Sequence, residues 1–200
     1  MCIRDRRQRG RLFRLRAKST KKTKTRPRHR RRRVQIVVTA LYPGSFDPVT
    51  VGHVDIVSRA ANLFENVVVS VYDTPSKNLL FNTDEREQLM KDACKDLPNV
   101  AVTRFSGLVV RHAMDIRAGV IVRGLRSGSD FEYEFDMAFM NRRLEPAVDL
   151  LCFMTSQDYM FVSASLLKEV AKLGGDITEM VPPNVAQAVY SKFELPVKEG

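Results

Sequence analysis

Short runs rich in β-branched residues alternate with segments of helical periodicity along most of this 200-residue chain. The runs predict strands at residues 34–41, 67–72, 100–104, 120–123 and 149–154. The segments between them predict helices at residues 54–64, 83–96, 108–117 and 129–144, and Pro182-Pro183 is typical of the start of a last helix. Repeated β-α-β units imply right-handed crossovers and a parallel sheet. We therefore expect residues 34–200 to form one α/β domain, with a Rossmann-like five-stranded parallel sheet and helices on both faces.

The segment YPGSFDPVTVGH at residues 42–53 connects the first predicted strand to the first predicted helix. It places Gly52 and His53 near a helix N-terminus, where free backbone N–H groups and the helix dipole favour a phosphate. Gly52 has no Cβ, so the backbone can approach a ligand closely, and His53 can add a donor. An ordinary strand-turn-helix connection with an incidental histidine explains this segment equally well.

Polar and basic residues follow other predicted strands too. In a parallel α/β sheet, ligands bind beyond the carboxyl ends of the strands. The residues at these ends are Ser45 and His53 after the first strand, Ser76-Lys77 after the second, Arg123-Gly124-Leu125-Arg126 after the fourth, and Ser163-Ala164-Ser165 beyond the fifth. Each alone is typical of a solvated surface, but their coincidence at one edge favours a phosphate site, because Arg offers a bidentate fork and Lys a compact charge.

The positive net charge of the chain, +10, comes from its first residues. Residues 1–33 contain 17 Lys and Arg and one acid, Asp5, whereas the rest has 16 bases and 22 acids, a net charge of −6. With few apolar residues and no periodic pattern, residues 1–33 predict a disordered basic tail. The acidic remainder argues against nucleic-acid binding through the folded domain.

Three explanations of the tail stay open: an arm that binds nucleic acid, an organelle transit segment, or a sequence foreign to the native protein. We favour the last, because Met1-Cys2-Ile3-Arg4-Asp5-Arg6 can be back-translated as ATG TGT ATA AGA GAC AG plus one base. That string resembles the end of a transposase adapter used in sequencing libraries. N-terminal mass spectrometry that finds residues 11–33 on the native protein would contradict this interpretation.

The cysteines and the hydropathy pattern indicate a cytoplasmic protein. Cys2, Cys94 and Cys152 are odd in number and form no CxxC pair, so they predict neither a disulfide framework nor a zinc site. No apolar run approaches the roughly 18 residues that span a bilayer, and the N-terminus lacks the apolar region of a secretory signal. We expect no membrane partner.

Four motifs carry a family resemblance. They are YPGSFDPVTVGH at residues 42–53, PSK at 75–77, RGLRSGSDFEYE at 123–134 and VSASLLKEVAKLGGDI at 162–177. From about residue 35 to residue 194, the chain resembles the bacterial phosphopantetheine adenylyltransferases, within the nucleotidyltransferase superfamily that shares a (T/H)xGH signature. That signature alone is weak, because relatives that use other nucleotides and some aminoacyl-tRNA synthetases carry versions of it, whereas the third motif is far more specific. Departures are mild: Ser45 stands where Thr is common, and Ala164 where Ser is common.

The resemblance implies transfer of AMP from ATP to 4′-phosphopantetheine, which gives dephospho-coenzyme A and pyrophosphate in coenzyme A biosynthesis. It also implies magnesium (Mg2+) as the cofactor, with no protein ligand assigned to it, no covalent intermediate, and a homohexamer built as a dimer of trimers. The phosphate of phosphopantetheine would attack the α-phosphorus of ATP in line. The enzyme's tasks would then be positioning and charge stabilisation.

Residue roles follow from the same resemblance. His53 would stabilise the transition state, with Lys77 and Arg123 as further catalytic residues. Phosphopantetheine would be bound by Ser45, Lys77, Val109 and Arg123. ATP would be bound by Ser45, Phe46, His53, Gly124, Leu125, Arg126, Glu134, Tyr159, Met160, Phe161, Val162, Ser163, Ala164 and Ser165.

Two carboxylates have alternative explanations. Glu134 near phosphates is repulsive unless a cation or a ribose hydroxyl intervenes, so its ATP role is implied by the resemblance alone, and an ion pair with an arginine such as Arg126 is an equal alternative. Asp47 precedes a proline, which is a frequent turn arrangement.

Outside the motifs, the helix expected at residues 129–144 has the strongest pattern. Ser129 and Glu132 form a capping-box pattern at its start. One apolar stripe has Phe131, Phe135, Ala138 and Phe139, and another has Tyr133, Met137, Met140 and Leu144. Such a helix is either deeply buried or part of a subunit contact. His112, away from any motif, is expected to serve packing or to lie on the surface.

Two other functions stay open. A sibling transferase would act on another phosphorylated acceptor, such as nicotinate mononucleotide or glycerol 3-phosphate, although the PSK and RGLR motifs disfavour it. A nucleic-acid-binding protein would act through the tail, and its binding would depend strongly on salt and vanish when residues 1–33 are removed.

Overall fold

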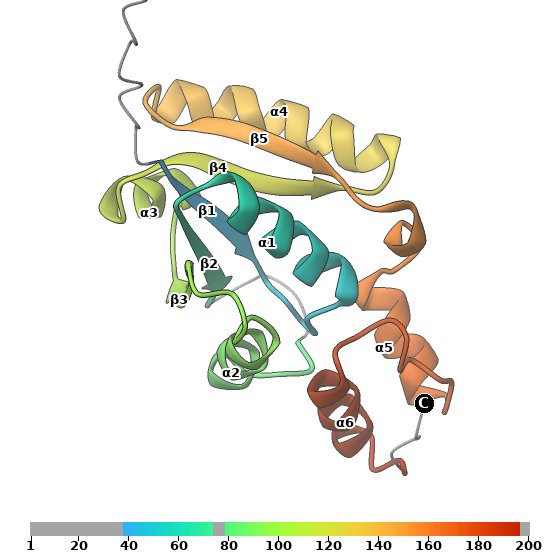
Figure 1. The fold of residues 1–200 in the computed structure, drawn as a ribbon. Coiled ribbons are helices and arrows are strands. Elements are labelled where there is room, and N and C mark those ends of the chain that lie inside the picture. Colours follow the sequence, from blue (N-terminus) through green and yellow to red (C-terminus); the bar gives the residue numbers. More distant parts are fainter. Residues whose placement is uncertain (1–37, 74–78, 197–200) are drawn as a thin grey trace, which may run out of the picture. The chain divides into compact units, whose positions relative to one another are not determined.

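The computed structural model describes residues 38–73 and 79–196, and these form an α/β unit around one sheet (Figure 1). All neighbouring strands are parallel, in the order β3-β2-β1-β4-β5. The strands are β1 (Thr39–Gly44), β2 (Asn66–Tyr72), β3 (Val100–Phe105), β4 (Ala118–Leu125) and β5 (Asp149–Met154). The predicted five-stranded parallel sheet is confirmed, whereas the predicted tail and Lys77 lie outside the described residues.

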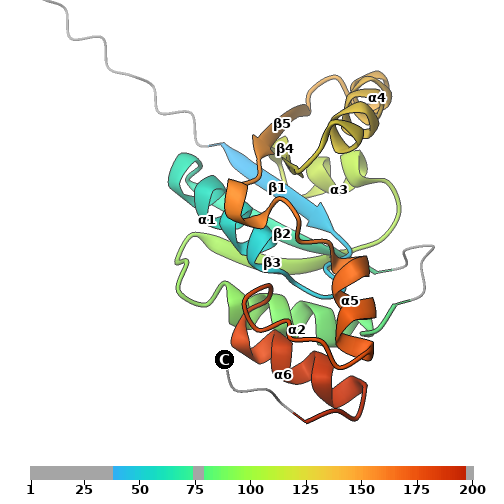
Figure 2. The ribbon, with the colours of Figure 1, turned by 90° about the vertical axis from the view of Figure 1, so that its right-hand side faces the viewer.

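Helices cover both faces of the sheet (Figures 1 and 2). They are α1 (Val51–Leu63), α2 (Thr83–Ala93), α3 (Val109–Asp115), α4 (Gly128–Leu144), α5 (Ala164–Lys172) and α6 (Pro183–Lys192), with a short 3-10 helix, η1 (Gln157–Tyr159), between β5 and α5. Buried residues of α1, α2, α5 and α6 form one core cluster with the sheet, and those of α3 form a second cluster. Helix α4 lies on the α3 side, because Phe135 and Ala138 share a small cavity with Ile121 of β4.

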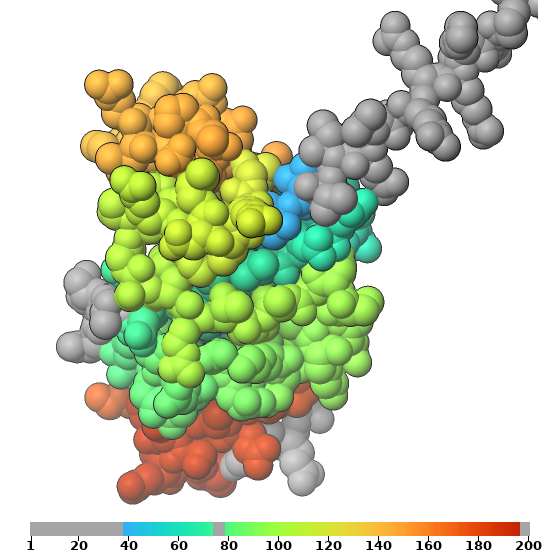
Figure 3. Space-filling model, turned by 90° about the vertical axis from the view of Figure 1, so that its left-hand side faces the viewer, coloured from blue at the N-terminus to red at the C-terminus, as the bar shows by residue number. Residues whose placement is uncertain are grey.

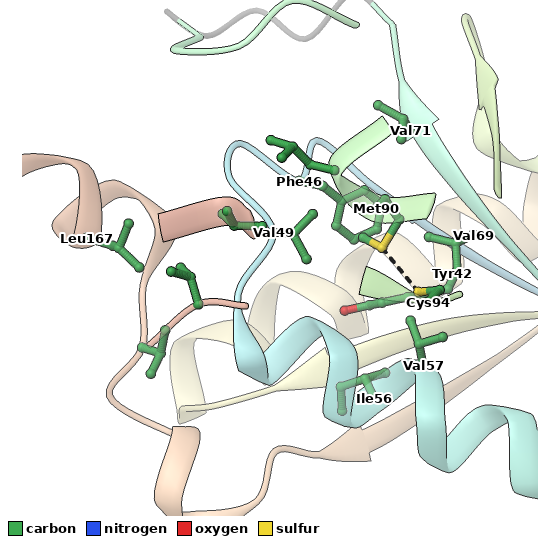
Figure 4. Close-up of a cluster of buried hydrophobic side chains, with 14 of the residues drawn as sticks. Tyr42, Phe46, Val49, Ile56, Val57, Val69, Val71, Met90, Cys94 and Leu167 are labelled. Atoms are coloured by element: carbon green, nitrogen blue, oxygen red, sulfur yellow. Dashed lines mark hydrogen bonds between the residues drawn. The ribbon is translucent and has the colours of Figure 1, made fainter. Parts of the chain in front are cut away.

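The larger core lies between the sheet and α1 and α2. Figure 4 shows its centre, where Tyr42 and Phe46 lie among the valines of β2 and the apolar face of α1. Cys94, just after α2, is buried and contacts the sulfur of Met90 at 3.6 Å. Burial raises the pKa of the Cys94 thiol to about 11, so this cysteine is an apolar core residue without a reactive thiolate.

The outer strand β3 is covered by α2 along one side. Arg104 of β3 forms ion pairs with Asp84 at 2.8 Å and Glu87 at 3.0 Å, both on α2. In Figure 3, the green residues of α2 and β3 lie between the red residues of α6 and the yellow-green residues of α3. The Arg104 ion pairs attach α2 to the outer strand of the sheet.

The order of the strands changes direction at β1, which makes the end of β1 the expected position for a ligand. From β1 the chain proceeds outward through β2 to β3, then returns to place β4 on the other side of β1. Ligands of open α/β sheets bind at such a switch point, beyond the carboxyl ends of the strands. Those ends carry Tyr42 to Gly44 of β1 and Arg123 to Leu125 of β4.

Two helix starts differ from the prediction. Helix α1 begins at Val51, three residues before the predicted start, because Thr50 caps it and accepts a hydrogen bond from the His53 backbone N–H. Helix α4 is capped by Ser127, whose hydroxyl accepts from the Asp130 N–H, so the predicted Ser129 capping box is wrong. Among the described residues, no helix combines the length and apolar character needed to cross a membrane.

Candidate active site

One cavity of about 810 Å³ lies at the switch point. Its walls come from the loop after β1, the first turn of α1, the end of β4, the inner face of α4, the start of α3, and the segment from η1 to α5. Most of the predicted site residues line it: Ser45, Phe46, His53, Val109, Arg123, Gly124, Arg126, Glu134, Tyr159, Val162, Ser163, Ala164 and Ser165. The structure thus brings together residues up to 120 positions apart in the chain.

Three predicted residues do not line the cavity. Leu125 is buried, only 4% exposed, and its carbonyl accepts from the Thr155 N–H. Met160 and Phe161 are 46% and 66% exposed and are absent from the cavity wall. Leu125 lies inside the third motif, and Met160 and Phe161 come directly before the fourth, so the resemblance alone did not tell which side chains face the cavity.

The cavity exists because β1 and β4 separate. β1 pairs with β4 only from Thr39 to Leu41, whereas its pairing with β2 continues to Gly44. Pro43 has no backbone N–H, so it suits a strand side without a partner. Arg123 of β4 fills this position, and its guanidinium donates to the Pro43 carbonyl at 3.0 Å. The basic side chain of Arg123 is therefore held at the opening between the two strands.

His53 stands at the third position of α1 and completes a capping box. Its Nδ1 accepts from the Thr50 N–H at 3.0 Å, while the Thr50 hydroxyl accepts from the His53 N–H at 3.3 Å. A backbone N–H can only donate, so Nδ1 carries no proton in this arrangement. The neutral ring then carries its proton on Nε2. The helix cap itself fixes the tautomer of the cavity histidine.

Burial, and then the charge of Arg126, lower the pKa of His53 to about 4. At neutral pH the ring is an uncharged donor. The ring packs edge-on against Phe46, with centroids 5.2 Å apart. Phe46 itself has a positive φ of 48°, a conformation that is uncommon for a bulky residue and that collects at functional sites. A residue larger than glycine does not fit at position 44, because its Cβ would lie 2.7 Å from the Phe46 ring.

The two cavity arginines are each tied to a carboxylate of α4 and to a carbonyl of another wall. Arg123 Nε donates to Glu134 Oε2 at 2.9 Å. Arg126 binds Asp130 through Nε at 3.1 Å and Nη2 at 3.3 Å, and donates from Nη1 to the Val162 carbonyl at 3.1 Å. Glu134 thus forms the ion pair with an arginine that the sequence offered as an alternative, but its partner is Arg123, because Arg126 pairs with Asp130, one turn earlier on α4.

These ties orient the guanidinium groups without exhausting them. Burial by itself raises the pKa of Asp130, but hydrogen bonds from the side chain and backbone of Arg126 outweigh it, and the net pKa is lowered. A guanidinium has five N–H donors, and the contacts described within residues 38–73 and 79–196 use three of Arg126 and two of Arg123. Each arginine keeps donors for an anion in the cavity.

Arg86 of α2 supports the loop after β1. No motif pointed to this residue. Its side chain is fully buried. It donates to the carbonyls of Ser45 and Tyr72 at 2.8 Å each, and to Phe81 at 3.2 Å. A buried charge is tolerated only with such partners, and here they join the ends of β1 and β2. No local pattern in the sequence distinguished this arginine from a surface base.

Two glycines of the cavity have different reasons to be glycine. A Cβ on Gly124 would lie 3.1 Å from Ile56 of α1, so this glycine permits close packing of β4 on α1. A Cβ on Gly52 would meet protein atoms only at 3.6 Å or beyond, which is ordinary contact. The fold does not require a glycine at position 52, which leaves close approach of a ligand as its reason.

Helix α4 has no buried residues, so the predicted alternative of deep burial is wrong. The stripe of Tyr133, Met137, Met140 and Leu144 faces the large cavity. The other stripe lies outside it: Phe131, Phe135 and Phe139 are 54%, 51% and 63% exposed, and their rings contact one another in series. Phe135 and Phe139 also line a smaller, mostly apolar cavity of about 260 Å³ against β4 and β5.

His112 is a packing residue, as predicted. Its ring stacks on Phe105 with centroids 4.8 Å apart, and its Nε2 is 2.9 Å from the buried Ser70 hydroxyl. Burial lowers the pKa of His112. The residue supports Phe105, which lines the cavity, without lining it itself.

Comparisons with known proteins identify the family of this chain. The chain matches the cytidylyltransferase-like family over residues 41–170. It is 52% identical over 163 residues to the phosphopantetheine adenylyltransferase of Thermomicrobium roseum, a match that covers 80% of this chain and 98% of that protein. It is 50% identical over 155 residues to the phosphopantetheine adenylyltransferase of Caldanaerobacter subterraneus subsp. tengcongensis, over 78% of this chain and 97% of that protein.

A solved structure supports the fold alone. The putative nicotinate-nucleotide adenylyltransferase from Vibrio parahaemolyticus superposes with a TM-score of 0.59, over 80% of this chain and 96% of that one, at 16% identity. The sequence relatives decide the family. The chain belongs to the cytidylyltransferase-like family and, within it, to the phosphopantetheine adenylyltransferases.

Proposed function

We propose that this protein is a pantetheine-phosphate adenylyltransferase, which transfers AMP from ATP to 4′-phosphopantetheine in coenzyme A biosynthesis. The observation that carries the proposal is the convergence of His53, Arg123 and Arg126 on one cavity at the switch point of the sheet. This cavity has donors for phosphates and, on α4, an apolar wall. The approximately 50% identity to proteins named for this activity supports the same conclusion.

The residues of the cavity suit direct transfer. The acceptor phosphate attacks the α-phosphorus in line, and negative charge grows on the oxygens of the crowded phosphorus. His53 acts there as a neutral Nε2–H donor, because its cap to Thr50 and its low pKa leave that proton in place at neutral pH. A donor already oriented in the free protein needs no reorganisation in the transition state. Catalysis then requires no protein nucleophile.

The two arginines divide the substrates between them. Arg126 bridges α4 to Val162, just before Ser163 and the start of α5, so we assign it with Ser163, Ala164 and Ser165 to the ATP phosphates. Arg123 of β4 donates to the Pro43 carbonyl of β1 and lines the cavity together with Ser45, and we assign it to the acceptor phosphate. Lys77, which we assign to the same phosphate by its motif, lies outside the described residues.

The apolar wall suits the rest of the acceptor. Apolar side chains of α4 and of the start of α3 line the same cavity: Tyr133, Met137, Met140 and Leu144, with Leu108 and Val109. A pantetheine arm is long, flexible and partly apolar, and methionines adapt to such shapes. ATP offers no comparable apolar chain, so this wall favours phosphopantetheine over a smaller acceptor.

Mg2+ supplies neutralisation of phosphate charge in reactions of this type. Within the described residues, no three His, Cys, Asp or Glu side chains stand together as a metal site. Asp130 and Glu134 of the cavity are already paired with Arg126 and Arg123. We therefore propose that the ion is bound chiefly by the phosphates of ATP, as Mg2+ commonly is.

The test is an acceptor panel. The full chain is incubated with ATP, Mg2+ and one acceptor at a time: 4′-phosphopantetheine, nicotinate mononucleotide or glycerol 3-phosphate. We expect dephospho-coenzyme A by mass and equimolar pyrophosphate with the first acceptor only. Product with nicotinate mononucleotide or glycerol 3-phosphate in its place would assign a sibling transferase, and no product with any acceptor would contradict the proposal.

We also propose that the exposed stripe of Phe131, Phe135 and Phe139 is buried in a homohexamer, a dimer of trimers, in the cytoplasm. Three neighbouring phenylalanines, each more than half exposed, form a patch of the kind that marks protein contacts. Light scattering of the eluted protein should give the mass of six chains, and Phe135→Glu should lower it. A wild-type protein that stays monomeric at micromolar concentration would contradict this assembly.

The folded domain is not proposed to bind nucleic acid. Residues 34–200 have a net charge of −6, which opposes the electrostatic attraction on which such binding depends. Any affinity of the full chain for nucleic acid should vanish when residues 1–33 are removed.

A further inference from the structure

The Asp47 carboxylate joins three separate parts of the chain, which the turn arrangement predicted for it does not explain. Its two oxygens accept from the Leu80 N–H at 3.1 and 3.0 Å and from the Phe81 N–H at 2.9 Å. Oδ2 also accepts from Lys168 Nζ at 2.5 Å. Lys168 lies 121 positions further along the chain, on α5. A carboxylate that served only its own turn would not need this partner.

The ion pair connects two walls of the cavity. Asp47 belongs to the loop that carries Ser45 and leads into the first turn of α1, where His53 stands. Lys168 lies about one turn after Ser163, Ala164 and Ser165, which line the cavity from the start of α5. Figures 1 and 2 both show α5 beside the loop between β1 and α1. The pair is therefore one of the contacts that join α5 to the loop before His53.

Besides this pair, the hydrogen bond from Arg126 to the Val162 carbonyl holds the chain just before α5, and little of the helix itself is buried. Only Leu167 and Ala171 are buried along it, and Leu166 and Val170 are 57% and 40% exposed. Ser163, the residue before its first turn, makes no side-chain capping bond. The Asp47 and Lys168 side chains are 3% and 22% exposed, so their attraction is screened less than that of a surface pair. Lys168 itself does not line the cavity.

We propose that Lys168 is a positioning residue for adenylyl transfer. Through Asp47, it holds the start of α5, and with it the donors for the ATP phosphates, in register with His53. The inference rests on the proposed function, since it takes Ser163 to Ser165 as the site of those phosphates. Displacement of a positioning element by about 1 Å can cost on the order of 100-fold in rate, so the loss of one remote ammonium should be measurable.

The first experiment replaces Lys168 with Met in the full chain. We expect the KM for ATP to rise about tenfold and kcat to fall several-fold, while the KM for phosphopantetheine stays within about twofold. Lys168→Arg keeps a cation and should restore most of the loss. Lys172→Met is the matched control, the same change one turn later on the exposed end of α5, and should behave as wild type.

The second experiment separates positioning from general destabilisation and also covers the case in which Lys168→Met does not fold. Asp47→Asn removes the other charge of the pair, and it should produce the same ATP-selective change. In the double variant Asp47→Asn/Lys168→Met, the loss should equal that of Asp47→Asn alone, because Asp47→Asn already removes the ion pair and also alters the hydrogen bonds from Leu80 and Phe81. Additive losses, equal changes in both KM values, or wild-type kinetics of Lys168→Met would overturn the proposal.

ATP binding distinguishes this inference from the proposed function. Calorimetry with ATP and Mg2+ alone needs no acceptor, and Lys168→Met should raise the Kd for ATP about tenfold, which is the KM change expected above. An unchanged Kd would overturn the role of Lys168. If wild-type protein gives no dephospho-coenzyme A but this Kd still shifts, the proposed acceptor is wrong and the role of the ion pair stands.

Discussion

The polar wall and the apolar wall of the cavity differ in how firmly the protein holds their side chains. On the polar wall, the groups are held by the protein itself: His53 by its helix cap, Arg123 by Glu134 and the Pro43 carbonyl, and Arg126 by Asp130. On the apolar wall of α4, Tyr133 and Met140 are about 60% exposed, at 61% and 58%. The polar wall is fixed before a ligand arrives, whereas the apolar wall has side chains that can adjust to one.

The difference follows from what each wall must do. Stabilisation of a transition state depends on donors that need no reorganisation, so fixed geometry is an advantage there. Recognition of a flexible acceptor depends on buried apolar area, which adaptable side chains provide. Changes to the polar wall should therefore affect kcat or phosphate binding strongly, and changes to the apolar wall should affect acceptor binding moderately.

The largest effect is expected from His53→Ala. It should lower kcat by roughly 100- to 1,000-fold, the usual cost of one lost transition-state donor, with little change in either KM. Steady-state kinetics measures this, and His112→Asn is the control, because His112 is outside the cavity wall. If kcat of His53→Ala is unchanged, or if His112→Asn loses as much, His53 is not the donor.

Next in size are the two arginines, which should separate the substrates. Arg126→Met should raise the KM for ATP and Arg123→Met the KM for phosphopantetheine, each by about 10- to 100-fold, because a hydrogen bond to a charged group contributes about 1.5–3 kcal/mol. Kinetics with each substrate varied in turn gives both values. If both variants affect the same substrate, the division between the arginines is wrong.

A smaller effect is expected on the apolar wall. Met137→Ala should raise the KM for phosphopantetheine by about tenfold and leave kcat nearly unchanged, since it removes apolar contact worth about 1.5 kcal/mol. Met114→Ala is the matched control, because Met114 is 43% exposed on α3 and does not line the cavity. A fall in kcat for Met137→Ala with a constant KM would remove the distinction between the two walls.

The smallest effect concerns the position where Ala164 replaces a common Ser. Ala164 lines the cavity at the first position of α5. Ala164→Ser should lower the Kd for ATP several-fold, because a typical hydrogen bond contributes roughly 0.5–1.5 kcal/mol net. Calorimetry measures this directly. A weaker affinity would mean that a hydroxyl at this position does not reach the phosphates.

The sequence predicted the sheet and most of the polar wall because both depend on local signals. β-branched runs gave five strands, with the bounds of β5 as predicted, and strand ends gave His53, Arg123 and Arg126. The two stripes of α4 were visible as well. Both are apolar at helical spacing, so the pattern contained nothing to tell which of them faces the cavity.

Contacts between residues that are distant in the chain could not be predicted from the sequence. Arg123 and Arg126 both had an acid within reach on α4, and only the three-dimensional structure assigned Glu134 to the first and Asp130 to the second. The separation of β1 from β4 after Leu41 depends on the register of the sheet, which no local signal encodes. No motif pointed to Arg86, because its role depends on the distant carbonyls of Ser45 and Tyr72.

The state of the His53 ring in the ligand-free protein tests the central claim most directly, that the polar wall is complete before substrate binds. Nitrogen-15 NMR should find a neutral ring protonated on Nε2, with a pKa of about 4. Because an unfolded chain takes up this proton near pH 6.5, the free energy of unfolding should also fall as pH drops from 6.5 to 4. A ring that titrates near 6.5, or that carries its neutral proton on Nδ1, would contradict the claim.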